Sequence, residues 1–293
     1  MTIHREGEIH YQEFSKGKYE KPLEVIGTTK KTGTTIEFQP DDSIFEVIEY
    51  SFEILSKRFR EVAYLNPFIT INLEDKRSNK KETYHFEGGI KQFVEDTNKS
   101  KAITDAISFS AKEDGVEVDI ALMYNDTYVG NTKSFVNNIN TMDGGTHEAG
   151  FKDGLTRSIR KYLKENANAR DKDAKLDGND VREGLVSVVS VRVPEPQFEG
   201  QTKGKLGSSY VKPICQKLTY EALNKYFEEN PAQAKLVMEK SLMAARGREA
   251  AKKSRELYRK QIHVCGTLPV NCNCQTKTRN AEYSSGRDLL EIC

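Results

Sequence analysis

The sequence predicts an α+β protein. Apolar and polar residues alternate at period two over 69–75 and 116–125, as in half-buried strands, and a continuous apolar run covers 185–193. Apolar residues also recur at helical spacing over 41–66 and again beyond residue 151. Strands mixed with helices in this way are typical of α+β or α/β folds, and 293 residues suit about two domains.

The first segment is expected to form, in order, a strand, a loop, a second strand, a long helix and a third strand. A β-branched strand covers 32–40. Ser43 and Glu46 have the spacing of a capping box, so the helix over 41–66 is expected to start there. The strand over 69–75 is followed by a charged turn over 76–82. The apolar face of the helix comprises Ile44, Ile48, Phe52, Leu55, Phe59 and Val62.

A second segment begins near Glu87. It contains the strands over 116–125 and 185–193, and a solvated loop over 169–180 precedes the second of them. A glycine-rich connection over 143–151 leads into a helix that carries Leu155, Ile159 and Leu163. Two further helices are expected at 209–229 and 231–260, with Asn230 as N-cap and Pro231 as first helical residue.

Charge and cysteine usage narrow the class of protein. The formal net charge is +1, so a nucleic acid or a membrane would have to meet a local patch. No run approaches 18 apolar residues and no apolar segment follows Met1, which predicts a soluble protein that is not exported. Four of the 5 cysteines lie at or after residue 265, whereas a secreted disulfide framework would spread them, so a cytoplasmic location is expected.

The stretch EGQTKGKLG, residues 199–207, is the first candidate site. It joins glycines, two lysines and Gln201 directly after an apolar strand. It fails the P-loop pattern, because Leu206 follows Lys205 where Ser or Thr is required. The residue types alone leave two interpretations open: a loop that holds phosphate and a flexible basic turn.

The end of the last helix is strongly basic. Residues 246–260 hold seven Lys or Arg against two Glu. One interpretation is a solvated helical face. The other is a contact with a nucleic-acid backbone or an interface with an acidic neighbour.

His147, Glu148 and Asp143 lie close together in the stretch SFVNNINTMDGGTHEAGF, residues 134–151. Neither HxxxH nor HExxH spacing occurs, so a metal site is not indicated. A structural role is expected instead, in which His147 bonds within the turn. The backbone groups of this stretch are expected to bond to Asn137, Asn138 and Asn140.

Seven blocks of the sequence are similar, in order, to those of one known family. They are TGTTIEFQPD, FREVAYLN, EGGIKQFVE, SFVNNINTMDGGTHEAGF, DVREGLVSVVSV, PQFEGQTKGKLG and AAKKSRELYRK. Over about residues 1–260 the chain resembles the ATPase subunit of bacterial type IIA topoisomerases, of the gyrase or the topoisomerase IV kind. The resemblance implies that 1–86 is the C-terminal part of a Bergerat-type (GHKL) ATPase domain. It implies a ribosomal-S5-like transducer domain with a long C-terminal helix for 87–260, and a degenerate or frame-shifted start of a Toprim domain for 261–293.

The resemblance also implies an ATP-binding role for four residues. The family's Gln-Thr-Lys loop, which reaches from the transducer to the γ-phosphate, matches Gln201-Thr202-Lys203. Lys203 would supply a point charge and Gln201 an amide donor, whereas Lys205 is expected to be a surface charge. Gly33 and Thr34 match the family's Gly-Thr pair, whose hydroxyl supports the adenine-binding aspartate.

The resemblance begins inside the family's ATPase domain and ends before its Toprim metal site. Nothing in the chain matches the glutamate that activates water, the asparagine that holds Mg²⁺, the adenine-binding aspartate or the glycine-rich lid. The chain alone is therefore expected to be inactive as an ATPase and to expose an apolar face. Residues 261–293 have a second interpretation besides a frame shift, namely a metal site. The ligands of this site would be Cys265, Cys272, Cys274 and Cys293, although their C-x-C spacing is poor for zinc.

By resemblance, the full enzyme uses ATP and Mg²⁺ and passes one DNA duplex through a transient break in another. The expected partners are double-stranded DNA, the DNA-cleaving A-type subunit and, on ATP binding, a second copy of this subunit. No contact with a membrane is expected. Two alternatives remain open. The chain is a non-catalytic module that binds DNA or a partner through 246–260, or it belongs to another enzyme that pairs this ATPase with a transducer.

Overall fold

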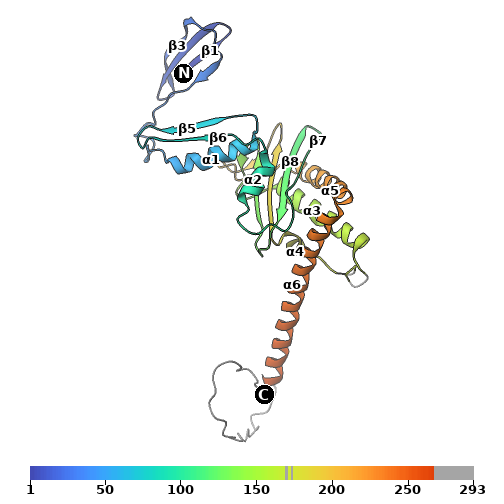
Figure 1. The fold of residues 1–293 in the computed structure, drawn as a ribbon. Coiled ribbons are helices and arrows are strands. Elements are labelled where there is room, and N and C mark those ends of the chain that lie inside the picture. Colours follow the sequence, from blue (N-terminus) through green and yellow to red (C-terminus); the bar gives the residue numbers. More distant parts are fainter. Residues whose placement is uncertain (169–170, 173, 267–293) are drawn as a thin grey trace. The chain divides into compact units, whose positions relative to one another are not determined.

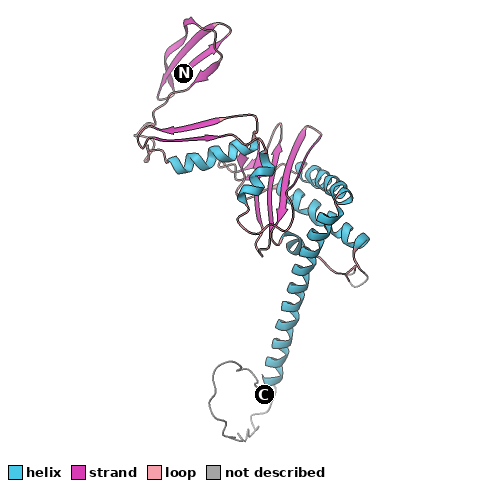
Figure 2. Ribbon diagram, in the orientation of Figure 1, coloured by secondary structure: helices cyan, strands magenta, loops and turns pink. Residues whose placement is uncertain are grey.

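The computed structural model describes residues 1–168, 171–172 and 174–266. The chain divides into two compact units, Met1–Gly89 and Ile90–Cys293, and each is described by itself. Both units mix helices with strands (Figure 2).

The first unit begins with a four-stranded antiparallel sheet (Figure 1). Its strands have the order β3-β2-β1-β4, with β4 paired to β1 in the register Ile3↔Thr34. The predicted strand over 32–40 is therefore wrong beyond Thr35, because β4 ends there. The sequence did not reveal the two hairpin strands, since register shifts between β2 and β3 interrupt the period-two pattern. The strands are β1 (Thr2–Arg5), β2 (Glu8–Ser15), β3 (Lys18–Thr28) and β4 (Gly33–Thr35).

The first helix starts later than the sequence predicts. α1 spans Phe52–Leu65, and the Oγ of Ser51 accepts from the Ile54 N–H at 3.4 Å. The expected capping box at Ser43 is wrong, because Asp41 accepts hydrogen bonds from both the N–H and the hydroxyl of Ser43 and so closes a turn there. Asp41 thus holds this stretch in a local side-chain turn that competes with helix.

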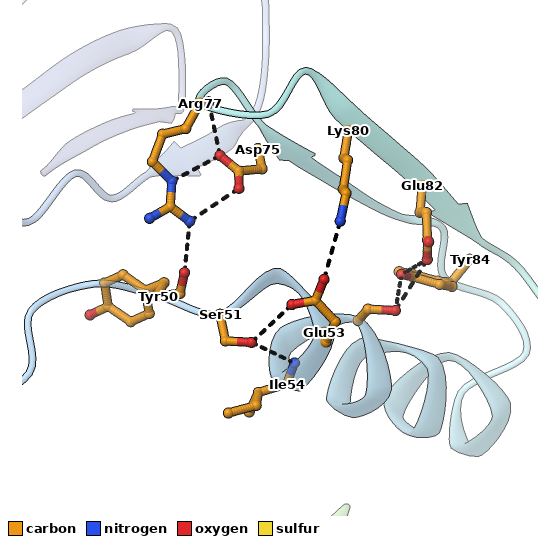
Figure 3. Close-up of polar contacts among 10 residues, drawn as sticks. Tyr50, Ser51, Glu53, Ile54, Asp75, Arg77, Lys80, Glu82 and Tyr84 are labelled. Atoms are coloured by element: carbon orange, nitrogen blue, oxygen red, sulfur yellow. Dashed lines mark hydrogen bonds and ion pairs between the residues drawn. The ribbon is translucent and has the colours of Figure 1, made fainter.

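Polar contacts fix the first turn of α1 against the hairpin that follows it (Figure 3). The Lys80 ammonium donates to Glu53 at 3.1 Å, and the Arg77 guanidinium donates to the Tyr50 carbonyl at 2.7 Å. Arg77 also binds Asp75, and these hydrogen bonds lower the pKa of the Asp75 carboxyl to about 2. Both cations come from the hairpin, so these contacts join the hairpin to the first turn of the helix.

That hairpin comprises β5 (Ile71–Asp75) and β6 (Lys80–Tyr84), paired from Ile71↔Tyr84 to Asp75↔Lys80. The predicted strand over 69–75 is confirmed in its main part. The predicted turn over 76–82 is wrong after Asn79, because Lys80 begins the return strand. The return strand was not predicted because its residues are charged. Lys81 pairs across the ladder with Glu74 at 3.0 Å, so these charges face solvent and each other.

The first unit exposes much of its apolar surface. No residue of 1–51 is buried, although this stretch holds many large apolar side chains. Phe38 is 70% exposed and Val47 is 77% exposed. The first unit thus leaves many of its apolar side chains in contact with water.

Amide exchange is therefore expected to differ between the two units. The amides of 1–86 should exchange fast because few buried contacts hold them, whereas those of the sheet and helices between 87 and 260 should be protected. Exchange followed by mass spectrometry on the whole chain measures this. Equal protection in both units would show that the first unit is stable with its apolar face in water.

The second unit is a five-stranded mixed sheet with helices packed on it. The strand order is β10-β9-β11-β8-β7, and β11 runs antiparallel to β8 and parallel to β9. The predicted strands over 116–125 and 185–193 are confirmed by β8 and β11. The strands are β7 (Ile107–Glu113), β8 (Val116–Tyr124), β9 (Asn131–Val136), β10 (Ile139–Asn140) and β11 (Leu185–Arg192).

α3 (Thr146–Asn166) and α5 (Val211–Glu229) cover one face of this sheet and pack on each other. Leu155, Ile159 and Leu163 are buried in this core, as predicted. The two helices approach closely at Gly150, where an added Cβ would lie 2.4 Å from the Lys212 carbonyl oxygen. On the other face, Phe93 of α2 (Gly89–Thr97) packs against Phe135 of β9.

Two helices complete the unit. α4 (Gly178–Arg182) begins inside the loop predicted over 169–180, so that prediction is wrong for residues 178–180. A helix starts there because the Asp180 carboxylate accepts a hydrogen bond from the Asp177 N–H at 2.7 Å. α6 (Pro231–Gly266) begins at Pro231 as predicted and extends past residue 260. Residues 249–259 of α6 are exposed.

Candidate functional site

The Gln-Thr-Lys stretch lies at the tip of a short hairpin. β12 (Phe198–Glu199) pairs with β13 (Lys205–Leu206), and Gln201, Thr202 and Lys203 between them are exposed. Lys203 has a φ of 54°, and its N–H bonds to the Gly200 carbonyl at 3.3 Å. The turn therefore has a defined backbone conformation that presents three polar side chains to solvent.

The two lysines of this hairpin have different surroundings. The Lys205 ammonium lies 3.0 Å from the Glu199 carboxylate on the facing strand. The Lys203 ammonium lies 5.9 Å from the centre of the Phe198 ring. Because the Lys205 charge is engaged across the ladder, Lys203 is the cation that this loop offers to an anion.

A glycine turn anchors the hairpin from β10 and α3. The Asp143 N–H donates to the Gly204 carbonyl at 3.0 Å, and the Leu206 N–H donates to the Gly144 carbonyl at 3.2 Å. Gly145 touches the same strand so closely that an added Cβ would lie 2.6 Å from the Leu206 nitrogen. The sequence shows one part of this anchor, the Gly144-Gly145 pair. It does not show that β13 is the strand that this pair contacts.

His147 also holds the glycine turn in place. Its side chain is fully buried, and Nε2 lies 3.2 Å from the Thr141 hydroxyl, which itself donates to the Ser134 carbonyl at 3.0 Å. Burial lowers the pKa of His147 to about 4, so the imidazole is neutral at pH 7. The predicted structural role of His147 is confirmed by this contact.

Asn137 has the expected backbone role. Its amide donates to the Val193 carbonyl at 2.8 Å, and its carbonyl oxygen accepts from the Val193 N–H at 2.8 Å. Val193 follows β11 and leads to the hairpin. Asn137 therefore fixes the point from which the hairpin departs.

Gly33 and Thr34 belong to the other compact unit. Both are exposed residues of β4, where Thr34 pairs with Ile3 of β1. Gly33 has a φ of 151°, which favours glycine. The structure thus places each predicted pair within its own unit: Gln201 and Lys203 on the hairpin, and Gly33 and Thr34 on the sheet edge.

Neither a metal site nor a membrane-spanning helix is found among the described residues. No group of three or more His, Cys, Asp or Glu side chains among them could hold a metal ion. No helix among them has the length and apolar character needed to cross a membrane. The structure does not describe the side chains of the alternative metal site in the tail, which are those of Cys265, Cys272, Cys274 and Cys293. Most of the segment expected to be frame-shifted, 261–293, also lies outside the described residues.

Comparison with known proteins gives concordant matches. The model of the family DNA gyrase B matches residues 89–257. The DNA gyrase B protein of Campylobacter jejuni is 64% identical over 278 residues, which are 94% of this chain and 36% of that protein. The chain therefore spans about a third of the length of this curated relative.

Solved structures match over most of the chain. The 43K ATPase domain of Thermus thermophilus gyrase B, in complex with an aminocoumarin, is 35% identical with a TM-score of 0.75; the match covers 87% of this chain and 70% of that one. The topoisomerase IV ATP-binding domain of Francisella tularensis, in complex with a small-molecule inhibitor, is 28% identical with a TM-score of 0.73, over 84% of this chain and 68% of that one. The predicted α+β fold with a GHKL-type ATPase relationship is confirmed by these matches.

Proposed function

Because this chain belongs to the DNA gyrase B family, we propose that it forms part of the ATP-hydrolysing subunit of a type IIA DNA topoisomerase. Such an enzyme changes DNA topology by ATP-dependent passage of one duplex through another. The anchored Gln-Thr-Lys hairpin carries the proposal, because it presents Gln201 and Lys203 on a defined turn. The expected location is the cytoplasm. Residues 1–86 would be the C-terminal part of the ATPase domain and residues 87–260 the transducer domain, and the division of the chain after Gly89 supports this.

The chemistry of the hairpin suits a triphosphate. Lys203 would supply a positive charge and Gln201 an amide donor to the γ-phosphate, where charge develops during hydrolysis. Gly33 and Thr34 would serve the adenine side, with the Thr34 hydroxyl supporting an aspartate. ATP supplies the phosphoryl group and the free energy of its hydrolysis. The residues of this chain would bind and orient it.

Mg²⁺ does not fit the described residues in the same way. Among them, no three acidic, His or Cys side chains converge on one point, so we assign the ion no ligand among the described residues. The general base and the metal ligand would have to come from further parts of the family's ATPase domain.

A chimera tests the proposal. Residues 1–257 of this chain would replace the matching segment of Campylobacter jejuni gyrase B, which is 64% identical, and the chimera would be combined with the A-type subunit of that enzyme. We expect ATP-dependent supercoiling of a relaxed plasmid. A chimera that folds and dimerises with ATP but leaves the plasmid unchanged, beside an active parent, would contradict the proposal.

The basic end of α6 provides a second observation, which favours binding of DNA. Arg248 pairs with Asp180 at 2.8 Å and Arg246 pairs with Asp171, so these two cations hold α6 to the body of the unit. The residues beyond them are exposed. The outer cations of the helix are therefore the ones available to a phosphate backbone.

Reversing the outer charges is expected to weaken duplex binding without regard to sequence. In Lys252→Glu/Lys253→Glu/Arg255→Glu, the slope of log K against log salt should become shallower by about 2.7, since each of the three lost phosphate contacts removes about 0.9. Fluorescence anisotropy with two duplexes of unrelated sequence measures it. An unchanged slope would make this end of α6 a solvated face or a protein interface.

A further inference from the structure

A carboxylate packs against the glycine turn that anchors the Gln-Thr-Lys hairpin. It belongs to Glu148, the third residue of α3, whose side chain is 15% exposed. A Cβ added to Gly144 would lie 2.7 Å from the Glu148 Oε2, so no side chain fits between the carboxylate and the turn. The Gly144 carbonyl accepts the Leu206 N–H of β13. Glu148 therefore touches the turn at the residue that holds the hairpin.

Glu148 also joins the turn to the sheet. The Ser134 hydroxyl of β9 donates to the Glu148 Oε2 at 3.0 Å and lies 2.7 Å from the Thr141 hydroxyl. The Thr141 carbonyl accepts the Gly144 N–H at 3.0 Å, which closes the turn. A serine hydroxyl has one proton, and a carboxylate is a stronger acceptor than a neutral oxygen. Glu148 thus takes the Ser134 proton and leaves the Ser134 oxygen free to accept from Thr141.

The charge of Glu148 is balanced without loss of this contact. The Lys152 ammonium, four residues later on α3, binds Oε1, so Oε2 stays with Ser134. Glu148 and Lys152 both line a groove of about 990 Å³ whose wall also includes residues of α6. The carboxylate therefore keeps a cationic partner and access to water on its outer side, while its inner side supports the turn.

We propose that Glu148 is a positioning residue for Gln201 and Lys203. It supports Gly144, Gly144 holds β13, and β13 fixes where the tip of the hairpin lies. The inference rests on the proposed function, in which this tip serves ATP hydrolysis. A displacement of about 1 Å at a reacting centre can lower a rate about 100-fold, so a support that never touches ATP can still govern turnover.

The first test uses three side chains of similar length at position 148. Glutamine can still accept from Ser134 with its amide oxygen, whereas methionine cannot. In the chimera with Campylobacter jejuni gyrase B, Glu148→Met should lower kcat for ATP about 10-fold and leave KM within about twofold, because the tip acts on the enclosed nucleotide. Glu148→Gln should retain most of the parent turnover.

Glu239→Met is the matched control. It makes the same chemical change on α6, where Glu239 also pairs with a lysine four residues away, Lys235, at 3.8 Å. Its side chain is exposed and lies outside the network of the glycine turn. We expect the turnover of this variant to equal that of the parent.

The second test needs no nucleotide site and uses this chain alone. The Asp143 and Leu206 amides donate the two hydrogen bonds that anchor the hairpin. Their exchange should become at least about 10-fold faster in Glu148→Met, the effect of losing one hydrogen bond to a charged group. Exchange in Glu148→Gln and Glu239→Met should stay close to that of the parent.

Four results would overturn the inference. Parent-like turnover in Glu148→Met shows that the hairpin needs no such support, whatever the exchange rates are. Unchanged exchange of both amides in that variant shows that Glu148 does not hold the turn. Equal losses in Glu148→Gln and Glu148→Met assign the effect to charge and not to the bond with Ser134. A parent chimera without ATP turnover removes the proposed function and its positioning residue together, and the exchange rates then still show whether Glu148 anchors the hairpin.

Folding of each variant is checked by circular dichroism and thermal unfolding. Should Glu148→Met unfold, Ser134→Ala replaces it, because it removes the donor of the same hydrogen bond. The same loss of kcat and the same faster exchange are then expected. Parent-like turnover or parent-like exchange in Ser134→Ala also overturns the inference.

Discussion

Lys203→Ala is expected to lower ATP turnover about 100–1,000-fold in the chimera with Campylobacter jejuni gyrase B, and to weaken nucleotide binding much less. Lys203 lies on a hairpin of the second unit, whereas Gly33 and Thr34 lie in the first. A charge delivered from a separate unit acts mainly once the nucleotide is enclosed, and so on the charge that develops at the γ-phosphate. Steady-state turnover and binding of a non-hydrolysable analogue separate the two effects.

Two neighbouring substitutions serve as controls for Lys203. Gln201→Ala should reduce turnover less, because a neutral donor is weaker than a charged one. Lys205→Ala should leave turnover nearly unchanged, since its ammonium pairs with Glu199 at 3.0 Å on the exposed ladder. Loss of turnover in Lys205→Ala with normal turnover in Lys203→Ala would reverse the roles assigned to the two lysines.

The sequence predicted the second unit better than the first, for physical reasons. In β8 and β11 the apolar residues are buried in a continuous core, so their pattern follows the sheet. In the first unit the apolar residues of 44–50 have helical spacing, which predicted a helix, but they are exposed and no helix forms before Phe52. The first turn of α1 also contacts Arg77 and Lys80 of a later hairpin, and the sequence pattern gives no sign of these contacts.

The candidate site shows the same division. The Gln-Thr-Lys loop was proposed as a site through resemblance alone, since its residue types favoured a solvated basic turn. The support of the loop was not predicted, because it consists of two long-range backbone hydrogen bonds: from the Leu206 N–H to the Gly144 carbonyl and from the Asp143 N–H to the Gly204 carbonyl. Contacts of that kind leave no periodicity in either segment.

His147 is expected to make the stability of the second unit depend on pH. Its folded pKa is about 4, against about 6.5 in an unfolded chain, because burial disfavours the charged form. Between these values the unfolded chain binds more protons, so the stabilisation is complete above pH 6.5 and is lost as the pH falls toward 4. At about pH 5 the loss relative to about pH 7.5 should be about 2 kcal/mol.

Urea unfolding at these two pH values measures this loss, with His147→Gln as the variant and His85→Gln as the matched control. The His147→Gln chain should lose about 2 kcal/mol less than the parent between the two pH values, because glutamine does not titrate. His85→Gln should behave like the parent, since His85 is exposed and lies in the first unit. Equal pH dependence in all three chains would show that the imidazole is hydrated in the folded protein.

The same protonation should loosen the Gln-Thr-Lys hairpin. His147 bonds to Thr141, Thr141 begins the turn that ends at Gly145, and that turn accepts the Leu206 N–H through Gly144. A charged imidazole would have to reach water and so pull this turn from β13. The Leu206 amide should therefore exchange faster, relative to the intrinsic rate, at the lower pH than at the higher in the parent but not in His147→Gln. Unaltered protection of Leu206 in the parent would mean that the hairpin keeps its anchor when His147 is charged.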